Sequence, residues 1–219
     1  MNLRRMILGD PEGQTAFQKM KSKWDSARIE EELQKSFASI PNPLSIKWGD
    51  KLEIFGVEDV LLQVGAVEHC LLEGSEPDDP QMVRYHLKEV GGDHELHIEA
   101  IINGEEVEYA LFEIAEEFEF DEELADVLDK EDTLRQSFED DEGQPAFVDY
   151  DKENDFNMEI KGFHSEGQFS ARLRVVAYFC ENEAGEEEFL SVEISDKDGW
   201  TTIYLGRPLQ ASEITSFGS

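Results

Sequence analysis

The chain has 219 residues, and 52 acidic against 19 basic side chains give it a formal net charge of −33. A domain of this length buries about 70% of the surface that its unfolded chain exposes, so its core needs no disulfide or metal. Hydrophobic residues make up 39% of the chain and include 14 Phe, which excludes a wholly disordered polymer. The sequence has no apolar run of about 18 residues, so we expect no transmembrane segment.

The first 40 residues differ from the rest in charge and in periodicity. They carry 7 basic and 6 acidic side chains, a net charge of +1, whereas the remainder carries 12 and 46, a net charge of −34. Between residues 12 and 38, apolar side chains such as Phe17 and Trp24 recur at helical spacing. We therefore expect two parts: an amphipathic helix with its linker over residues 1–40, and one acidic domain over residues 41–219.

The role of this N-terminal helix has two interpretations. Amphipathic helices most often dock on their own domain, which here is acidic. Alternatively, Lys19, Lys21 and Lys23 contact a partner or a membrane surface, although the acidic run at 30–32 weakens the membrane interpretation. The apolar run at the start of the chain ends at Gly9, so we expect no export signal and a cytoplasmic location.

After residue 43 the hydrophobic pattern changes to a period of two, which is typical of strands that bury one face. The predicted strands cover residues 51–57, 60–72, 83–90, 95–102, 106–116, 146–151, 156–163, 171–181, 188–195 and 201–206. Gly91-Gly92-Asp93 and Asn103-Gly104 predict hairpin turns, because these residues tolerate positive φ.

One internal helix is predicted over residues 121–136. Leu124, Leu128 and Leu134 fall near one face, and the acidic side chains at its start suit the helix dipole. A short turn is expected at residues 211–215. The expected fold class is α+β, a mainly antiparallel β-sheet domain with the N-terminal amphipathic helix and this one acidic internal helix.

Negative charge is densest over residues 105–142, which hold 18 acidic side chains against Lys130 and Arg135. An unpaired carboxylate is too costly to bury, so most of these side chains must face water. They form either a solvated surface without a ligand or an acidic face that binds a basic protein. The residues predicted to bind such a partner are Glu105, Glu106, Glu108, Glu113, Glu116, Glu117, Glu119, Asp121, Glu122, Glu123 and Asp126.

Standard catalytic and cofactor motifs are missing from the sequence. The glycine patterns of nucleotide-binding loops do not occur, and residues 162–167 lack the spacing of a nucleophile elbow and predict a turn. The acids at 149–155 alternate like calcium ligands but lack the required glycine and final glutamate. On a strand His94 and His97 point to opposite sides, which argues against zinc. We therefore predict no catalytic, cofactor-binding or metal-binding residues, and no cofactor.

The two cysteines, Cys70 and Cys180, lie in apolar, strand-like segments. Free cysteine is among the most buried residue types, and cytosolic proteins rarely keep structural disulfides. We predict two reduced core thiols. A single bridge between them is the alternative.

A succession of strand-like segments resembles a known family. The likeness begins at Arg84-Tyr85-His86-Leu87, continues through the hairpin at 103–112 and closes with Tyr204-Leu205-Gly206-Arg207-Pro208-Leu209. In this order the segments resemble the YjfK-like family of uncharacterised bacterial proteins over residues 41–219. The resemblance implies a cytoplasmic accessory protein, similar to those encoded near phage-shock-type membrane-binding coiled coils, and it transfers no active-site residue.

Three functional hypotheses follow from the charge and the missing motifs. The first is a non-enzymatic cytoplasmic adaptor that binds a basic partner surface, in an envelope-stress system. The second is a DNA mimic that inhibits a nucleic-acid-binding protein, because rows of carboxylates imitate phosphates. The third is an enzyme whose pocket is assembled from scattered residues such as His86, Glu99, Tyr85 and Tyr109. Direct nucleic-acid binding is not expected, since the acidic domain repels phosphate.

Overall fold

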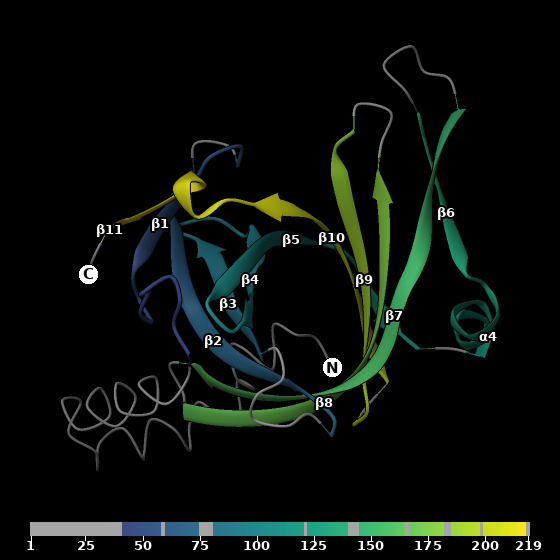
Figure 1. Cartoon of the computed structure of the whole chain (residues 1–219), viewed down its shortest axis with the longest axis horizontal. Coiled ribbons are helices and arrows are strands. Elements are labelled where there is room, and N and C mark those ends of the chain that lie inside the picture. The colour runs from purple at the N-terminus through teal and green to yellow at the C-terminus, as the bar shows by residue number, and fades with distance from the viewer. Residues whose placement is uncertain are drawn as a thin grey trace.

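The computed structural model describes residues 41–57, 60–74, 81–120, 122–139, 145–164, 167–181, 185–197 and 199–217. The amphipathic helix predicted within residues 1–40 lies outside these ranges, so its existence and role stay predictions. The described residues form a single sheet of eleven antiparallel strands, one short α-helix and one turn of 3-10 helix (Figure 1).

The strands and the α-helix are labelled in Figure 1. In chain order the elements are β1 (Lys51–Ile54), β2 (Leu62–Leu72), β3 (Gln81–Glu89), β4 (Glu95–Asn103), β5 (Glu106–Glu119), α4 (Glu122–Lys130), β6 (Thr133–Glu139), β7 (Pro145–His164), β8 (Gly167–Glu181), β9 (Glu187–Ser195), β10 (Trp200–Leu209), η1 (Ala211–Glu213) and β11 (Ile214–Phe217). In space the strands run β11-β1-β2-β3-β4-β5-β10-β9-β8-β7-β6.

Eight of these strands close into a barrel. The ring is β2-β3-β4-β5-β10-β9-β8-β7, and it closes because β2 also pairs with β7, with Cys70 opposite Ile160. β1 and β11 extend the sheet from β2 on one side, and β6 extends it from β7 on the other (Figure 1). Closure satisfies the backbone groups of all eight strands, which open edges would leave unpaired.

Irregularities in two long strands account for the closure. The register of β2 against β3 shifts between Val64 and Ala66; before this shift β2 pairs with β1, and after it β2 pairs with β7. In β7 the register against β8 shifts between Lys152 and Asn154, after the stretch that pairs with β6. A bulge adds one residue and increases local twist and bend, so each long strand can serve two partners in succession.

The predicted α+β class is wrong, because the described residues are almost entirely β. The internal helix predicted at 121–136 is confirmed only as α4, and the chain after Lys130 forms β6. There Arg135 donates to Asp149 and Thr133 to Asp151 across the β6–β7 pair, so sheet pairing outweighs local helical periodicity. Within the described ranges, no helix has the length and apolar character that crossing a bilayer needs.

The other predictions of secondary structure meet mixed outcomes. The predicted hairpin turns are confirmed, with positive φ at Gly91 and Gly104. The segments predicted as two strands at 146–151 and 156–163 are one strand, β7, because the break between them is only a bulge. The turn expected near the end of the chain is η1, and the strand β11 that follows it was not predicted.

Apolar side chains gather in three clusters, two of them outside the ring. The outer cluster lies on the outside of β2 to β5 beneath β1 and β11, and it includes Leu52, Val83, Tyr85, Leu87 and Ile98. The helix cluster lies on the outside of β8 to β10 against α4, and it includes Leu128, Val176, Tyr178, Leu190 and Val192. The inner cluster lies inside the ring and includes Cys70, Met158, Ile160 and Val175.

The cysteines lie in different clusters, Cys70 in the inner cluster and Cys180 in the helix cluster. Both are buried and free, as predicted, and the bridge between them is not formed. Burial raises the pKa of both thiols, which makes them weak nucleophiles. They therefore serve as small apolar side chains.

Candidate functional site

Strand alternation directs a row of charged side chains into the barrel. Along β3, Val83 and Tyr85 belong to the outer cluster. Arg84 and His86 alternate with them along the strand, so their side chains point to the other side of the sheet. The contact of Arg84 with Glu193 of β9, across the ring, identifies that side as the interior. Inside the ring lies what we call the Arg84 cluster, made of Glu68, Arg84, His86, His97, Glu99 and Glu193.

Arg84 lies at the centre of this cluster and joins carboxylates from three other strands. Its Nε and Nη2 donate to Glu99 Oε1 on β4, at 3.1 and 2.6 Å. Its Nη1 donates to Glu193 Oε2 at 3.1 Å, and Nη2 also donates to Glu193 Oε1. Glu68 on β2 is farther away, with Oε2 at 3.8 Å from Nη1. Only 3% of the Arg84 side chain is exposed, so these carboxylates replace water around its charge.

His97 and Glu99 form the best-defined pair of ionisation states in the cluster. Burial and the positive charge of Arg84 lower the pKa of His97 to about 3, so its ring is neutral at pH 7. Burial alone would raise the pKa of Glu99, but Arg84 and the hydrogen bond with His97 lower it to about 2. A carboxylate can only accept, so His97 Nε2 carries the proton of their 3.3 Å contact.

Glu193 behaves differently although it shares the same guanidinium. Burial raises the pKa of Glu193, and the nearby charges of Glu99 and Glu68 act in the same direction against the attraction of Arg84. Glu99 has His97 as an additional donor, which explains why the two carboxyls shift in opposite directions. Among the three carboxyls of the cluster, Glu193 is therefore the one that takes up a proton most readily.

Glu68 and His86 form the least satisfied part of the cluster. Glu68 Oε2 and His86 Nε2 lie 3.0 Å apart, within ion-pair distance. Both atoms are buried, and neither has a partner with hydrogen-bond alignment among the residues that the structure describes. Burial would raise the pKa of Glu68, but His86 and Arg84 together lower it. Glu68 is thus a buried carboxylate, and His86 Nε2 beside it is not aligned for a hydrogen bond.

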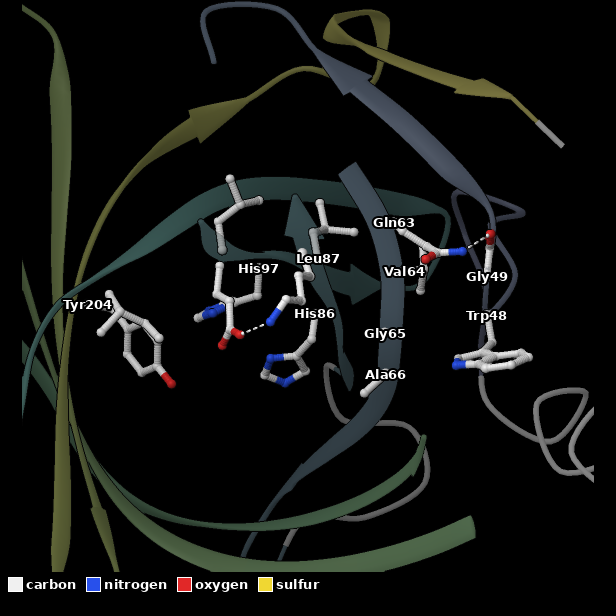
Figure 2. Close-up of a pocket in the computed structure, with 14 residues that line it drawn as sticks. Trp48, Gly49, Gln63, Val64, Gly65, Ala66, His86, Leu87, His97 and Tyr204 are labelled. Atoms are coloured by element: carbon white, nitrogen blue, oxygen red, sulfur yellow. Dashed lines mark hydrogen bonds and ion pairs between the residues drawn. The ribbon is translucent and has the colours of Figure 1, made fainter. Parts of the chain in front are cut away.

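Aromatic rings pack around the histidines. The His97 ring stacks on Phe112 of β5, with centroids 5.1 Å apart, and meets Tyr204 of β10 edge-on at 4.7 Å. The centroids of the His86 and His97 rings lie 5.6 Å apart. In Figure 2, His86, His97 and Tyr204 point into the same enclosed space. These contacts fix the rings from three strands and leave space beside them.

Two cavities adjoin inside the barrel. The larger has a volume of about 560 Å³, and its lining includes Glu68, Arg84, Glu193, Phe169, Trp200 and Tyr204. The smaller, of about 230 Å³, lies toward the end where Lys88 pairs with Glu95 at 2.9 Å (Figure 2). His86 and Tyr204 line both cavities and mark where they meet. A small organic ligand typically occupies a pocket of 300–1,000 Å³, so the larger cavity is of suitable size.

The acidic residues predicted to bind a partner lie mainly on β5 and the β4–β5 turn. The exposed ones are Glu105, Glu106, Glu108, Glu113, Glu116 and Glu119, together with Asp126 on α4. Glu117 is half-buried, with Trp200 Nε1 at 3.5 Å from its Oε1. Asp121 lies outside the described residues, and only the backbones of Glu122 and Glu123 are described.

These carboxylates do not all face the same way. Glu108 shares a side of β5 with Phe112, which faces the interior, whereas Glu113 lies opposite Leu205, on the outside of β10. Glu106 and Glu108 are exposed because they lie near the end of the strand, close to the β4–β5 turn. That these residues bind a partner stays a prediction.

The residues suggested for an enzyme pocket are divided between two sides of the sheet. His86 and Glu99 belong to the Arg84 cluster, whereas Tyr85 and Tyr109 pack in the outer cluster. Sequence reasoning missed Arg84, Glu68 and Glu193, although their alternation with apolar residues was visible. Such alternation is also what a strand facing water shows, so it gave no sign of a second buried side.

Among the described residues, no group of three or more His, Cys, Asp or Glu side chains has a geometry that could hold a metal ion. His94 lies apart from the Arg84 cluster, 3.8 Å from Glu113. No protein-family model, no curated protein and no solved structure matches the chain. The resemblance to the YjfK-like family therefore stays a prediction.

Proposed function

We propose that this protein binds a small organic molecule inside its barrel, in the larger cavity beside the Arg84 cluster. The observation that carries the proposal is a closed ring of eight strands around a cavity of about 560 Å³. Eight-stranded barrels are wide enough either to be filled by side chains or to hold one small ligand. The space left in this one favours the second use.

The lining of the cavity also supports ligand binding. Apolar side chains such as Ile160 and Leu173 lie on one part of it, and the buried charges of the Arg84 cluster lie on another. Binding pockets combine these two features, because apolar surface supplies affinity and a few fixed polar groups supply orientation. A barrel that needed only stability would gain more from a wholly apolar interior, since buried ion pairs are seldom net stabilising.

A fluorescent probe tests the proposal. N-phenyl-1-naphthylamine is neutral and gains fluorescence in apolar surroundings, so we expect it to bind the full chain saturably. Ala171 lines the cavity, and Ala171→Phe adds a phenyl group there. We expect this variant to bind the dye at least about fivefold more weakly, because the added ring competes for the same volume.

Ala115→Phe is the matched control, because Ala115 is exposed on β5. It should leave dye affinity within about twofold of the parent protein. Circular dichroism before each titration verifies that the variants are folded, and Leu173→Phe replaces Ala171→Phe if that variant unfolds. No saturable binding, or equal binding by both variants, would contradict a site in the cavity.

A second candidate function is binding of a basic protein through the exposed acids of β5. Six exposed carboxylates on β5 and its preceding turn favour it, because they attract a cationic surface at long range. Replacing Glu105, Glu106 and Glu108 by Gln should then reduce capture of a basic partner from native lysate at low salt. Capture that is equal for parent and variant would count against this surface.

A further inference from the structure

Inside the barrel, carboxyl groups outnumber the single guanidinium. Arg84 has its donors engaged by Glu99 and Glu193, which together already match or exceed its single positive charge. Glu68 is a third carboxylate for the same guanidinium, and at 3.8 Å it lies beyond hydrogen-bond distance. The cluster therefore places three carboxyl groups around one guanidinium, and Arg84 makes no hydrogen bond to Glu68.

The third carboxyl group belongs to a residue that lines the larger cavity. Only 9% of the Glu68 side chain is exposed, and its Oε2 has no aligned donor within the described part of the chain. A buried acceptor without a donor is destabilising, and more so when it is charged. Glu68 and His86 both line the larger cavity, so a ligand there can supply the missing donor.

The surroundings favour a cation over an anion. An anionic group beside Glu68 would approach three carboxyl groups, whereas a cationic group would be attracted to the one that Arg84 does not bind. The rings of Tyr204, Trp200 and Phe169 line the same cavity, and aromatic faces attract cations. The other charged residues that line the cavity balance in number, Arg172 and Lys197 against Glu159 and Asp196, so the surplus of carboxyl groups belongs to the Arg84 cluster.

We infer that the ligand carries an ammonium group, which binds beside the Glu68 carboxylate among the aromatic side chains of the cavity, with its hydrocarbon part against Ile160 and Leu173. This inference rests on the proposed function, because it names the chemical class of the molecule in the same cavity. An ammonium supplies charged N–H donors to Glu68, and its carbon skeleton matches the apolar part of the lining.

Three probes of similar shape and different charge test the inference. We would measure displacement of N-phenyl-1-naphthylamine from the full chain by 4-phenylbutylamine, 4-phenylbutan-1-ol and 4-phenylbutyrate at physiological salt. The amine should bind at least about tenfold more tightly than the alcohol, because hydrogen bonds to charged groups are the stronger ones. The butyrate should bind most weakly.

Glu68→Gln should reduce the preference for amine over alcohol to within about twofold, mainly by weakening the binding of the amine. Glu53→Gln is the control: it changes net charge equally on an exposed site of β1 and should leave the preference intact. If Glu68→Gln does not fold, the comparison of the three probes on the parent protein decides alone.

The outcomes separate the two proposals. If the dye binds in the cavity and the alcohol or butyrate displaces it as well as the amine, the cation inference is wrong and the binding function stands. A preference for the amine that survives Glu68→Gln also overturns the inference, because surface charge then explains it. If the dye and all three probes fail to bind, the proposed function itself is contradicted.

Discussion

Residues along β3 and β4 point alternately to the two sides of the sheet, and these two sides have opposite characters. On the outside, Tyr85 and Ile98 lie in a core of apolar side chains and are fully buried. On the inside, Arg84 and Glu99 are also buried, but as partners in an ion-pair cluster beside a cavity. The outer side is organised for packing, whereas the inner side keeps costly charges and empty volume, which is the expected signature of a site.

The largest expected effect comes from removing the central charge of the inner side. Arg84→Met should lower the free energy of unfolding by about 3–5 kcal/mol, because it leaves buried carboxylates without their cation. Urea denaturation followed by circular dichroism measures this. Adding Glu99→Leu and Glu193→Leu to the variant should restore much of the loss, because the inner side then resembles the outer one. A loss below about 1 kcal/mol for Arg84→Met would mean that the cluster is hydrated.

On the outer side, Ile98→Ala should cost about 3 kcal/mol, from lost apolar contacts and the cavity that remains. The same denaturation experiment measures it. Because no charge is involved, the loss should be equal at pH 5 and pH 7. A loss that varies with pH would show that the two sides of β4 are coupled.

Acidification should destabilise the protein through the inner side. The pKa of His97 is lowered from 6.5 to about 3 in the folded state, so the unfolded state binds more protons between these values, and stability falls as pH falls through that window. The loss from this group is at most about 1.4 kcal/mol per pH unit. Glu99, with its pKa lowered from 4.5 to about 2, adds a further loss below about pH 4.5.

His97→Phe isolates the histidine contribution, since a phenyl ring can keep the stack on Phe112. Its stability should depend less on pH between 6.5 and 4.5 than that of the parent protein, as urea denaturation at several pH values would measure. Equal slopes for parent and variant would contradict a neutral His97 in the folded state.

The smallest effect is expected at the surface of α4. Lys130 pairs with Asp126 at 2.7 Å, one helical turn away, and both side chains are more than 60% exposed. Lys130→Ala should change the free energy of unfolding by no more than about 0.5 kcal/mol. Thermal unfolding measures this, and a larger loss would indicate that the helix end has a further role.

The strands of the sheet could be predicted from sequence, whereas the barrel and its contents could not. Period two places β2 to β5 and β8 to β10 correctly, because each has one clearly apolar side. Closure depends on pairing between Cys70 and Ile160, distant in sequence, for which local pattern holds no signal. The sequence predicts two strands in place of β7, because the polar stretch around Lys152 and Asn154 is typical of a loop. It predicts a helix that continues into β6, because Leu134 fits both the helical period and the strand period.

The candidate site shows the same limit more sharply. His86 and Glu99 were named among residues that could share a pocket, but Tyr85 was grouped with them although it points away. The local pattern of β3 does not distinguish a charged row that faces water from one that faces β9 across the barrel. Only the closed topology makes both sides of the strand buried.

The most direct test of the central claim, that the barrel interior binds a ligand, uses Trp200 as an internal reporter. The chain has 3 Trp, and replacing Trp24 and Trp48 by Phe leaves only the one that lines the larger cavity. N-phenyl-1-naphthylamine should quench its emission saturably with one molecule per chain, and Ala171→Phe should weaken that quenching. Dye binding that leaves Trp200 emission unchanged, or no binding, would contradict the account.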